Sequence, residues 1–98
     1  MPNKSYNRGV AFERSVIKKL EEKGYTAART AGSHGKLDIW AMNKRFINLI
    51  QCKTTLKSPN IKMYIDDLRD ISKVVVPDNA IKELQIKYGR NLTRIRVL

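Results

Sequence analysis

The sequence has very few residues of the kinds that build disulfides or structural metal sites. It contains one cysteine, Cys52, and one histidine, His34. A single cysteine cannot form an internal disulfide, and this pair cannot supply the ligands of a structural zinc site. The composition therefore excludes a disulfide-stapled or zinc-stabilised domain and predicts a reduced thiol in an intracellular protein.

Long hydrophobic runs are also missing. No apolar segment approaches the roughly 18 residues that a membrane-spanning helix needs. The first residues, Met1–Lys4, do not resemble the hydrophobic segment of a secretory signal. No internal repeat or linker divides the chain, so we expect a single domain over residues 1–98 that acts in the cytoplasm.

Acidic residues are scarce relative to basic ones. Nine Asp and Glu stand against 20 Lys and Arg, which gives a formal net charge of +11. The basic residues are spread along the chain rather than gathered in one tail, so they predict a folded basic surface. Nucleic acid is favoured over a membrane as the partner, because no amphipathic interfacial helix is present. A DNA-binding protein without catalytic activity is the alternative to an enzyme.

The apolar spacing and the turn residues predict a mixed α/β domain, in which helices flank a central β-sheet in the order α-β-β-β-α-β-β. The expected helices cover residues 9–23 and 64–73. The expected strands cover residues 25–30, 36–42 and 45–53, followed by a C-terminal hairpin that turns at residues 89–91. A two-residue turn at Asn43 and Lys44 joins the second and third strands.

One acid of the first helix lies on its apolar side. At about 100° per residue, Glu13 falls in the middle of the stripe that contains Phe12 and Val16. A carboxylate that faces the core must be paired, protonated or bound to a cation, because burying it bare is costly. Two interpretations stay open: a salt bridge to a basic residue of the sheet, or a metal ligand at the edge of a cleft.

Three polar residues are expected to share one face of the predicted hairpin. With a two-residue turn, Asp38 lies opposite Leu49, and Gln51 and Lys53 point to the same face because side chains alternate along a strand. We expect the first helix, which carries Glu13, to cover this face. The alternative is an exposed sheet face with ordinary polar side chains.

This combination suits one kind of chemistry. Carboxylates, an amide oxygen and a strand carbonyl are ligands that Mg²⁺ accepts. A nearby ammonium group can orient a water molecule and stabilise the charge on a phosphate under attack. Together with the basic surface, these residues predict metal-dependent hydrolysis of phosphodiesters rather than passive binding.

The segments GVAFER at 9–14, GSHGKLDI at 32–39 and IQCKTT at 50–55 resemble the PD-(D/E)xK nuclease superfamily. Within it, the chain is most similar to the archaeal-type Holliday junction resolvases of archaea and their viruses, over about residues 8–64. The resemblance implies a restriction-endonuclease-like core and a homodimer that nicks four-way DNA junctions with Mg²⁺, or Mn²⁺ in its place. It also implies the cytoplasm of an archaeal cell or of a virus-infected archaeal host. Another DNA endonuclease of the superfamily is the alternative within this class.

The resemblance further implies the residues of the catalytic site. Glu13 corresponds to the acid of the first helix, Asp38 to the main metal-binding aspartate, and Lys53 to the catalytic lysine. The backbone carbonyl of Cys52 corresponds to a further metal ligand. Gln51 stands where the family usually has Glu, which removes one negative charge and should weaken metal binding, with Glu13 available as a compensating ligand.

Other residues are expected to contact DNA. Ser33 resembles a serine of the family that lies close to the scissile phosphate, and Arg29 resembles the basic residue just ahead of that loop. His34 is interpreted as a phosphate or surface contact rather than a catalytic base. The loop after the third strand is expected to contact the DNA backbone, or to be merely solvated, through its residues Lys57, Lys62 and Tyr64.

Overall fold

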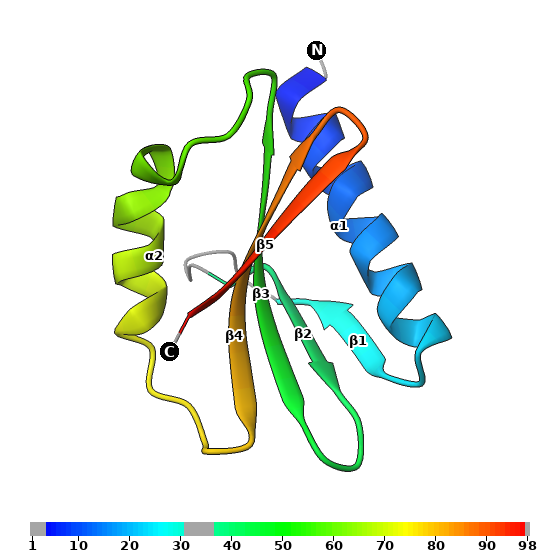
Figure 1. Ribbon diagram of the computed structural model, residues 1–98. Coiled ribbons are helices and arrows are strands. Elements are labelled where there is room, and N and C mark those ends of the chain that lie inside the picture. The colour runs from blue at the N-terminus through cyan, green and yellow to red at the C-terminus, as the bar shows by residue number, and fades with distance from the viewer. Residues whose placement is uncertain (1–3, 31–36, 98) are drawn as a thin grey trace.

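The computed structural model describes residues 4–30 and 37–97, and within them one mixed β-sheet has a helix packed against each face (Figure 1). A short 3-10 helix, η1, leads into the second α-helix. The elements along the chain are α1 (Lys4–Glu22), β1 (Thr26–Arg29), β2 (Ile39–Met42), β3 (Ile47–Thr55), η1 (Ile61–Tyr64), α2 (Ile65–Ser72), β4 (Ala80–Tyr88) and β5 (Asn91–Val97). This confirms the predicted α/β class and the predicted order of elements.

The five strands lie in the order β1-β2-β3-β4-β5. All neighbouring pairs are antiparallel except β3 and β4, which are parallel. A parallel pair needs a crossover connection, and the segment that contains η1 and α2 provides it. The β4–β5 hairpin turns at Gly89, whose φ of 58° lies in the left-handed region, as expected for the predicted C-terminal hairpin.

Two hydrophobic clusters hold the helices to the sheet. On the face covered by α1, the buried residues are Phe12, Val16, Ile39 and Ile50. On the face covered by α2, they are Tyr64, Ile71, Leu84 and Ile86. Within the described residues, no helix has both the length and the apolar character needed to cross a membrane.

The first helix is longer than predicted at its start. It begins at Lys4 rather than at residue 9, because residues 4–8 contain no helix-breaking proline or glycine and Gly9 alone does not end a helix. Its end is fixed by Gly24, whose φ is 93°. The Tyr25 N–H donates to the Leu20 carbonyl at 3.0 Å, which closes the helix in the manner of a Schellman motif.

The turn between β2 and β3 differs from the prediction. Residues 43–46 connect the strands, and Met42 lies opposite Ile47, so the two-residue turn at Asn43 and Lys44 is wrong. The cause is the Asn43 side chain, whose Oδ1 accepts hydrogen bonds from the backbone N–H groups of Arg45 and Phe46 at 2.8 and 2.7 Å. The connection has four residues instead of two, and because both numbers are even, each side chain of β2 and β3 stays on the face expected from the two-residue turn.

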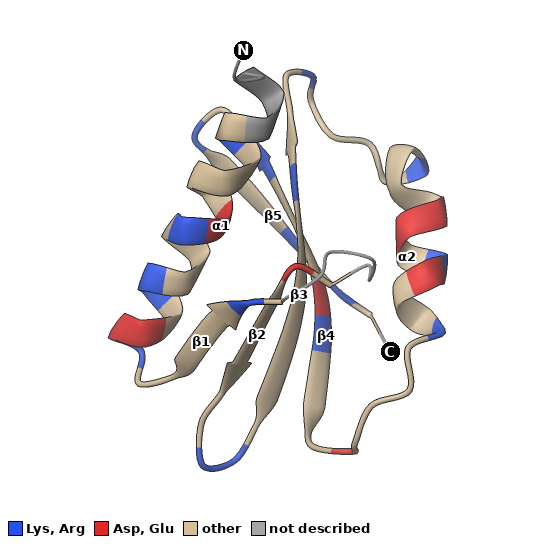
Figure 2. Cartoon of the chain, turned by 180° about the vertical axis from the view of Figure 1, so that it is seen from behind, with Lys and Arg blue, Asp and Glu red and all other residues tan. Residues whose placement is uncertain are grey.

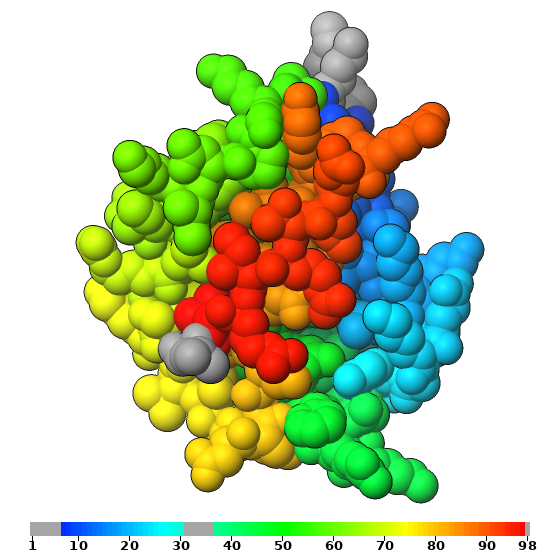
Figure 3. Space-filling view, in the orientation of Figure 1, coloured from blue at the N-terminus to red at the C-terminus, as the bar shows by residue number. Residues whose placement is uncertain are grey.

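Each helix bears residues of both signs, but the net charge of α1 is positive and that of α2 is negative (Figure 2). Exposed cations of α1 include Arg14, Lys18 and Lys19. The acids of α2 are Asp66, Asp67 and Asp70. Strand β5 forms one edge of the sheet and lies at the surface between the helices (Figure 3).

A buried lysine anchors the end of α2. Lys82 on β4 is only 7% exposed, and its Nζ donates to the carbonyl oxygens of Ile71, Ser72 and Val74 at 3.1, 3.2 and 2.9 Å. The last carbonyls of a helix lack partners within it, and they carry partial negative charge that favours a cation. Lys82 therefore caps α2 and fixes it to the sheet.

We expect Lys82→Met to lower the free energy of unfolding by about 2–3 kcal/mol, because the partly buried Ser72 and Val74 carbonyls lose their donor while the apolar stem is kept. Urea denaturation measures this change. The matched control is Lys73→Met at an exposed position of the same segment, which should change stability by less than about 0.5 kcal/mol. Equal losses in the two variants would contradict the capping role.

Candidate active site

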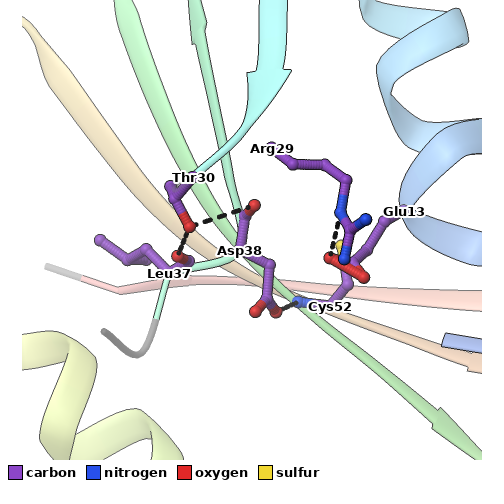
Figure 4. Close-up of polar contacts among 6 residues, drawn as sticks. All are labelled: Glu13, Arg29, Thr30, Leu37, Asp38 and Cys52. Carbon is purple, nitrogen blue, oxygen red and sulfur yellow. Dashed lines mark hydrogen bonds and ion pairs between the residues drawn. The ribbon is translucent and has the colours of Figure 1, made fainter. Parts of the chain in front are cut away.

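Asp38 lies just before the start of β2 and beside β3. The ladder between these strands ends at the pair Ile39 and Ile50, so Cys52 lies beyond it. The Asp38 N–H donates to the Ile50 carbonyl at 2.8 Å, and Asp38 Oδ2 accepts the N–H of Cys52 at 2.8 Å (Figure 4). The carboxylate thus replaces a strand partner for Cys52, which corrects the expected position of Asp38 opposite Leu49.

Glu13 reaches the same region from α1. Its side chain is 14% exposed, and its Oε1 lies 3.5 Å from Nε of Arg29 at the end of β1 (Figure 4). The salt bridge to the sheet, left open by the sequence, is therefore present. Asp38 is also close enough to raise the pKa of Glu13 by repulsion, so the two carboxylates act on one another.

Gln51 and Lys53 lie on the opposite face of the sheet from α1. Ile50 and Cys52 contact the α1 side, so the alternating side chains of Gln51 and Lys53 point toward the α2 side. The expectation that α1 covers the face of Gln51 and Lys53 is therefore wrong. Lys53 nevertheless lowers the pKa of Asp38 by attraction, because Asp38 sits at a strand end that both faces can reach.

The electrostatics of the two acids are dominated by burial. Burial raises the pKa of Asp38, against the hydrogen bond from Cys52 and the attraction of Lys53 and Arg29. Burial also raises the pKa of Glu13, against the attraction of Arg29. The thiol of Cys52 has its pKa raised as well, chiefly by burial, which leaves it protonated and unreactive. Two desolvated carboxylates in one place gain strongly from a bound cation.

The oxygens of this cluster fit a hard divalent cation. Within the described chain, Gln51 Oε1 is buried and has no hydrogen-bond partner. The Cys52 carbonyl lies on the same side of β3 as its N–H, and so faces Asp38. No three His, Cys, Asp or Glu side chains among the described residues are placed to hold a metal ion. A metal here therefore depends on the Gln51 amide and the Cys52 carbonyl beside the carboxylates of Asp38 and Glu13.

The predicted loop residues Ser33 and His34 lie outside the described residues. The two ends of their segment are tied together by Thr30, which the sequence analysis did not single out. Its Oγ1 donates to the Leu37 carbonyl at 2.8 Å, and its N–H donates to the Asp38 carbonyl at 2.9 Å (Figure 4). Thr30 therefore ties the end of β1 to the residues directly before β2.

Of the residues that follow β3 and were expected to contact DNA, two are exposed and one is buried. Lys57 and Lys62 are exposed and accessible. Tyr64 is only 7% exposed and packs in the cluster with Ile71 and Leu84, which corrects the expectation that its ring is available to DNA. The reason is that Tyr64 directly precedes α2, so that its ring becomes part of the surface with which this helix contacts the sheet.

A second carboxylate near Lys53 was also missed. Asp67 Oδ1 on α2 lies 3.6 Å from Lys53 Nζ. The sequence carried a signal for its place on the helix, because Asp67 precedes Leu68 and thus borders the apolar stripe of α2. The sequence carried no signal that Asp67 would pair with Lys53, because that pairing depends on how α2 packs against the sheet.

The mixed five-stranded sheet with a helix on each face is compatible with a restriction-endonuclease-like α/β core. The chain belongs to the archaeal Holliday junction resolvase (Hjc) family, whose model matches residues 4–97.

Individual relatives agree with this family. A crossover junction endodeoxyribonuclease Hjc of Methanocaldococcus jannaschii is 37% identical over 70 residues, which cover 71% of this chain. This chain spans 49% of that relative's length, or about half. The structure of Archaeoglobus fulgidus Hjc, a Holliday junction resolvase, has the same fold, with a TM-score of 0.72 and 24% identity over 92% of this chain and 73% of the other.

We expect Asp38→Asn to raise the melting temperature of the metal-free chain at neutral pH. Asparagine keeps an oxygen for the Cys52 N–H and removes the desolvated charge. The folded state binds the Asp38 proton more tightly than the unfolded state does, so the free energy of unfolding of the wild type rises as the pH falls through the raised pKa. The advantage of the variant should therefore vanish below the ordinary value of 3.8.

Thermal melts between neutral and acidic pH measure this difference. The matched control is Asp78→Asn at an exposed position, which should melt like the wild type throughout. An Asp38→Asn chain that is less stable than the wild type by the same margin at every pH would contradict the prediction.

Proposed function

We propose that this chain is a metal-dependent endodeoxyribonuclease that resolves four-way (Holliday) DNA junctions by paired nicks. Membership of the Hjc family and the names of the two relatives support this proposal. The observation that carries it is the cluster at the end of β2, where the desolvated carboxylates of Asp38 and Glu13 lie close enough to interact and Asp38 is bound to β3 through the Cys52 N–H.

Glu13, Asp38, Gln51 and the Cys52 carbonyl are proposed to hold Mg²⁺, or Mn²⁺ in its place. Such a cation, when bound, offsets the charge of a DNA phosphate and lowers the pKa of a water molecule. The geometry supports this assignment because these oxygens belong to two desolvated acids, a buried amide and a strand carbonyl, and neutral or anionic oxygens are what Mg²⁺ prefers.

The remaining side chains of the site are proposed to act on the water and on the phosphate. Lys53 positions the attacking water and stabilises the negative charge that develops on the phosphate. Ser33 assists at the scissile phosphate. Arg29 is 46% exposed, and it is proposed to exchange its contact with Glu13 for a DNA phosphate as the site fills.

DNA is proposed to bind along the basic surface. Exposed cations on α1, including Arg14 and Lys18, provide the sequence-independent attraction for phosphates (Figure 2). The acids of α2 make that side unfavourable for DNA. Beyond the catalytic cluster, the proposed DNA contacts are therefore Arg29, Ser33, His34, Lys57 and Lys62.

A homodimer is proposed as the active form, because two symmetric nicks need two sites. We also propose that the protein acts in the cytoplasm of an archaeal cell or of an infected archaeal host. The archaeal sources of both relatives support the archaeal setting. Sedimentation analysis, which should give twice the mass of the chain, tests the dimer, and a monomer bound to an uncut junction would contradict it.

We expect the wild type to nick a labelled synthetic four-way junction at symmetric positions in Mg²⁺ and to be inactive in EDTA. Asp38→Ala should abolish cleavage and keep junction affinity within about threefold, because the charge of the basic surface dominates binding. Asp78→Asn is the matched control and should cut normally. Linear duplex at equal salt should compete poorly.

The outcomes separate the alternatives. Binding without cleavage in either Mg²⁺ or Mn²⁺ would indicate a DNA-binding protein without catalytic activity. Cleavage of linear duplex as efficiently as of the junction would indicate another endonuclease on the same fold.

We expect Gln51→Glu to lower the Mg²⁺ concentration needed for half-maximal cleavage several-fold, because it adds a charged ligand. The same change should lower the melting temperature of the metal-free chain, since a third buried carboxylate is added beside Asp38 and Glu13. Mg²⁺ should recover the lost stability. Cleavage titrations and thermal melts measure both effects, and unchanged Mg²⁺ dependence would show that Gln51 is not a ligand.

A further inference from the structure

The ammonium group of Lys53 is attracted by two carboxylates that come from different parts of the fold. Asp38, at the start of β2, attracts it from the sheet. Asp67, in the first turn of α2, has Oδ1 3.6 Å from Lys53 Nζ. The side chain of Asp67 is only 24% exposed and that of Lys53 is 39% exposed, so this ion pair is partly shielded from water. Asp67 is therefore the carboxylate in direct contact with Lys53, and Asp38 adds a longer-range attraction.

The position of Asp67 follows from how α2 packs. Leu68 and Ile71 contact the sheet, and at about 100° per residue Asp67 borders their stripe while Asp66 points to the far side. The exposures agree, because the Asp66 side chain is 94% exposed and forms an ion pair with the exposed Arg69 of the same helix, at 3.9 Å. Of these two neighbouring acids, α2 thus directs only Asp67 to the candidate site.

The formal charges around Lys53 indicate what the negative charge of Asp67 can do. The side chains of Glu13, Asp38, Arg29 and Lys53 carry formal charges that cancel, and Gln51 adds none. A divalent cation held by Asp38 would repel the ammonium group of Lys53, whose long stem allows it to swing away. Asp67 adds one negative charge 3.6 Å from Lys53 Nζ. It therefore offsets the repulsion and keeps the ammonium group within reach.

We propose that Asp67 is a positioning residue that holds Lys53 beside the reacting phosphate while the cation is bound. The inference rests on the proposed nuclease function and adds a residue from α2 to it. A partly exposed ion pair contributes little to folding, so its removal should leave the fold intact. The loss should appear in the rate of cleavage and not in junction binding.

The test uses the full chain with three variants. Asp67→Asn removes the charge, Asp67→Glu restores it, and Asp66→Asn is the matched control one residue away. At saturating protein and Mg²⁺, we expect Asp67→Asn to cut a synthetic junction more slowly by on the order of tenfold. Its junction Kd without metal should stay within about twofold of that of Asp66→Asn, since each variant removes one charge. Asp67→Glu should recover most of the rate.

The contact between Asp67 and Lys53 can also be followed by a measurement that does not depend on cleavage. In ¹⁵N-labelled protein, the side-chain ammonium signal of Lys53 is identified by its loss in Lys53→Arg. We expect Asp67→Asn to shift or broaden this signal in the presence of Mg²⁺, and Asp66→Asn to leave it unchanged.

The results separate a failure of the proposed function from a failure of the role proposed for Asp67. A wild-type chain that leaves the junction intact overturns the proposed function together with this inference. Wild-type cleavage combined with an Asp67→Asn variant that cuts equally fast or faster, or an ammonium signal that both variants leave unchanged, overturns only the role of Asp67. A loss of rate that Asp67→Glu does not restore also overturns it.

Discussion

The hydrogen bond from the Cys52 N–H to Asp38 Oδ2 is the contact on which the candidate site depends. It places a carboxylate where the β2–β3 ladder ends, in the position of a missing strand partner. A side chain within a strand faces only one side of a sheet, whereas a group at this end can be approached from both. Glu13 from the α1 side and Lys53 from the α2 side can therefore act on the same carboxylate. The Cys52 carbonyl is directed to the same place by the same strand geometry.

Alternation and turn chemistry were sufficient to predict the class and order of the elements, and the hairpin at Gly89, because each depends on residues close together in the chain. The exact register of β2 and β3 was not predictable in this way. It is set by the side chain of Asn43, which binds two backbone N–H groups and lengthens the connection. The shift was even, so the alternation of faces along β2 and β3 was predicted correctly despite an incorrect turn.

The candidate site was predictable only in part. The helical period placed Glu13 on the buried side of α1, where the structure has it, because that period depends on one helix alone. The face that each helix covers is a tertiary property, and β3 is flanked on both faces, so its sequence does not identify which helix lies over Lys53. For the same reason Tyr64 was assigned to a loop surface, and Asp67 was missed.

The distribution of charge connects the basic surface to the site. A net charge of +11 favours a polyanion such as DNA, but the same field repels the divalent cation that the proposed chemistry needs. Negative charge must therefore outweigh it locally. Of the nine acids, Glu83 is already neutralised by Arg94 at 2.6 Å, and Asp66 points away into solvent. Burial makes Asp38 and Glu13 effective at short range, because little water screens them. With a neutral amide at position 51, the acid that α2 brings to Lys53 would offset the positive charge of that lysine beside the proposed cation site.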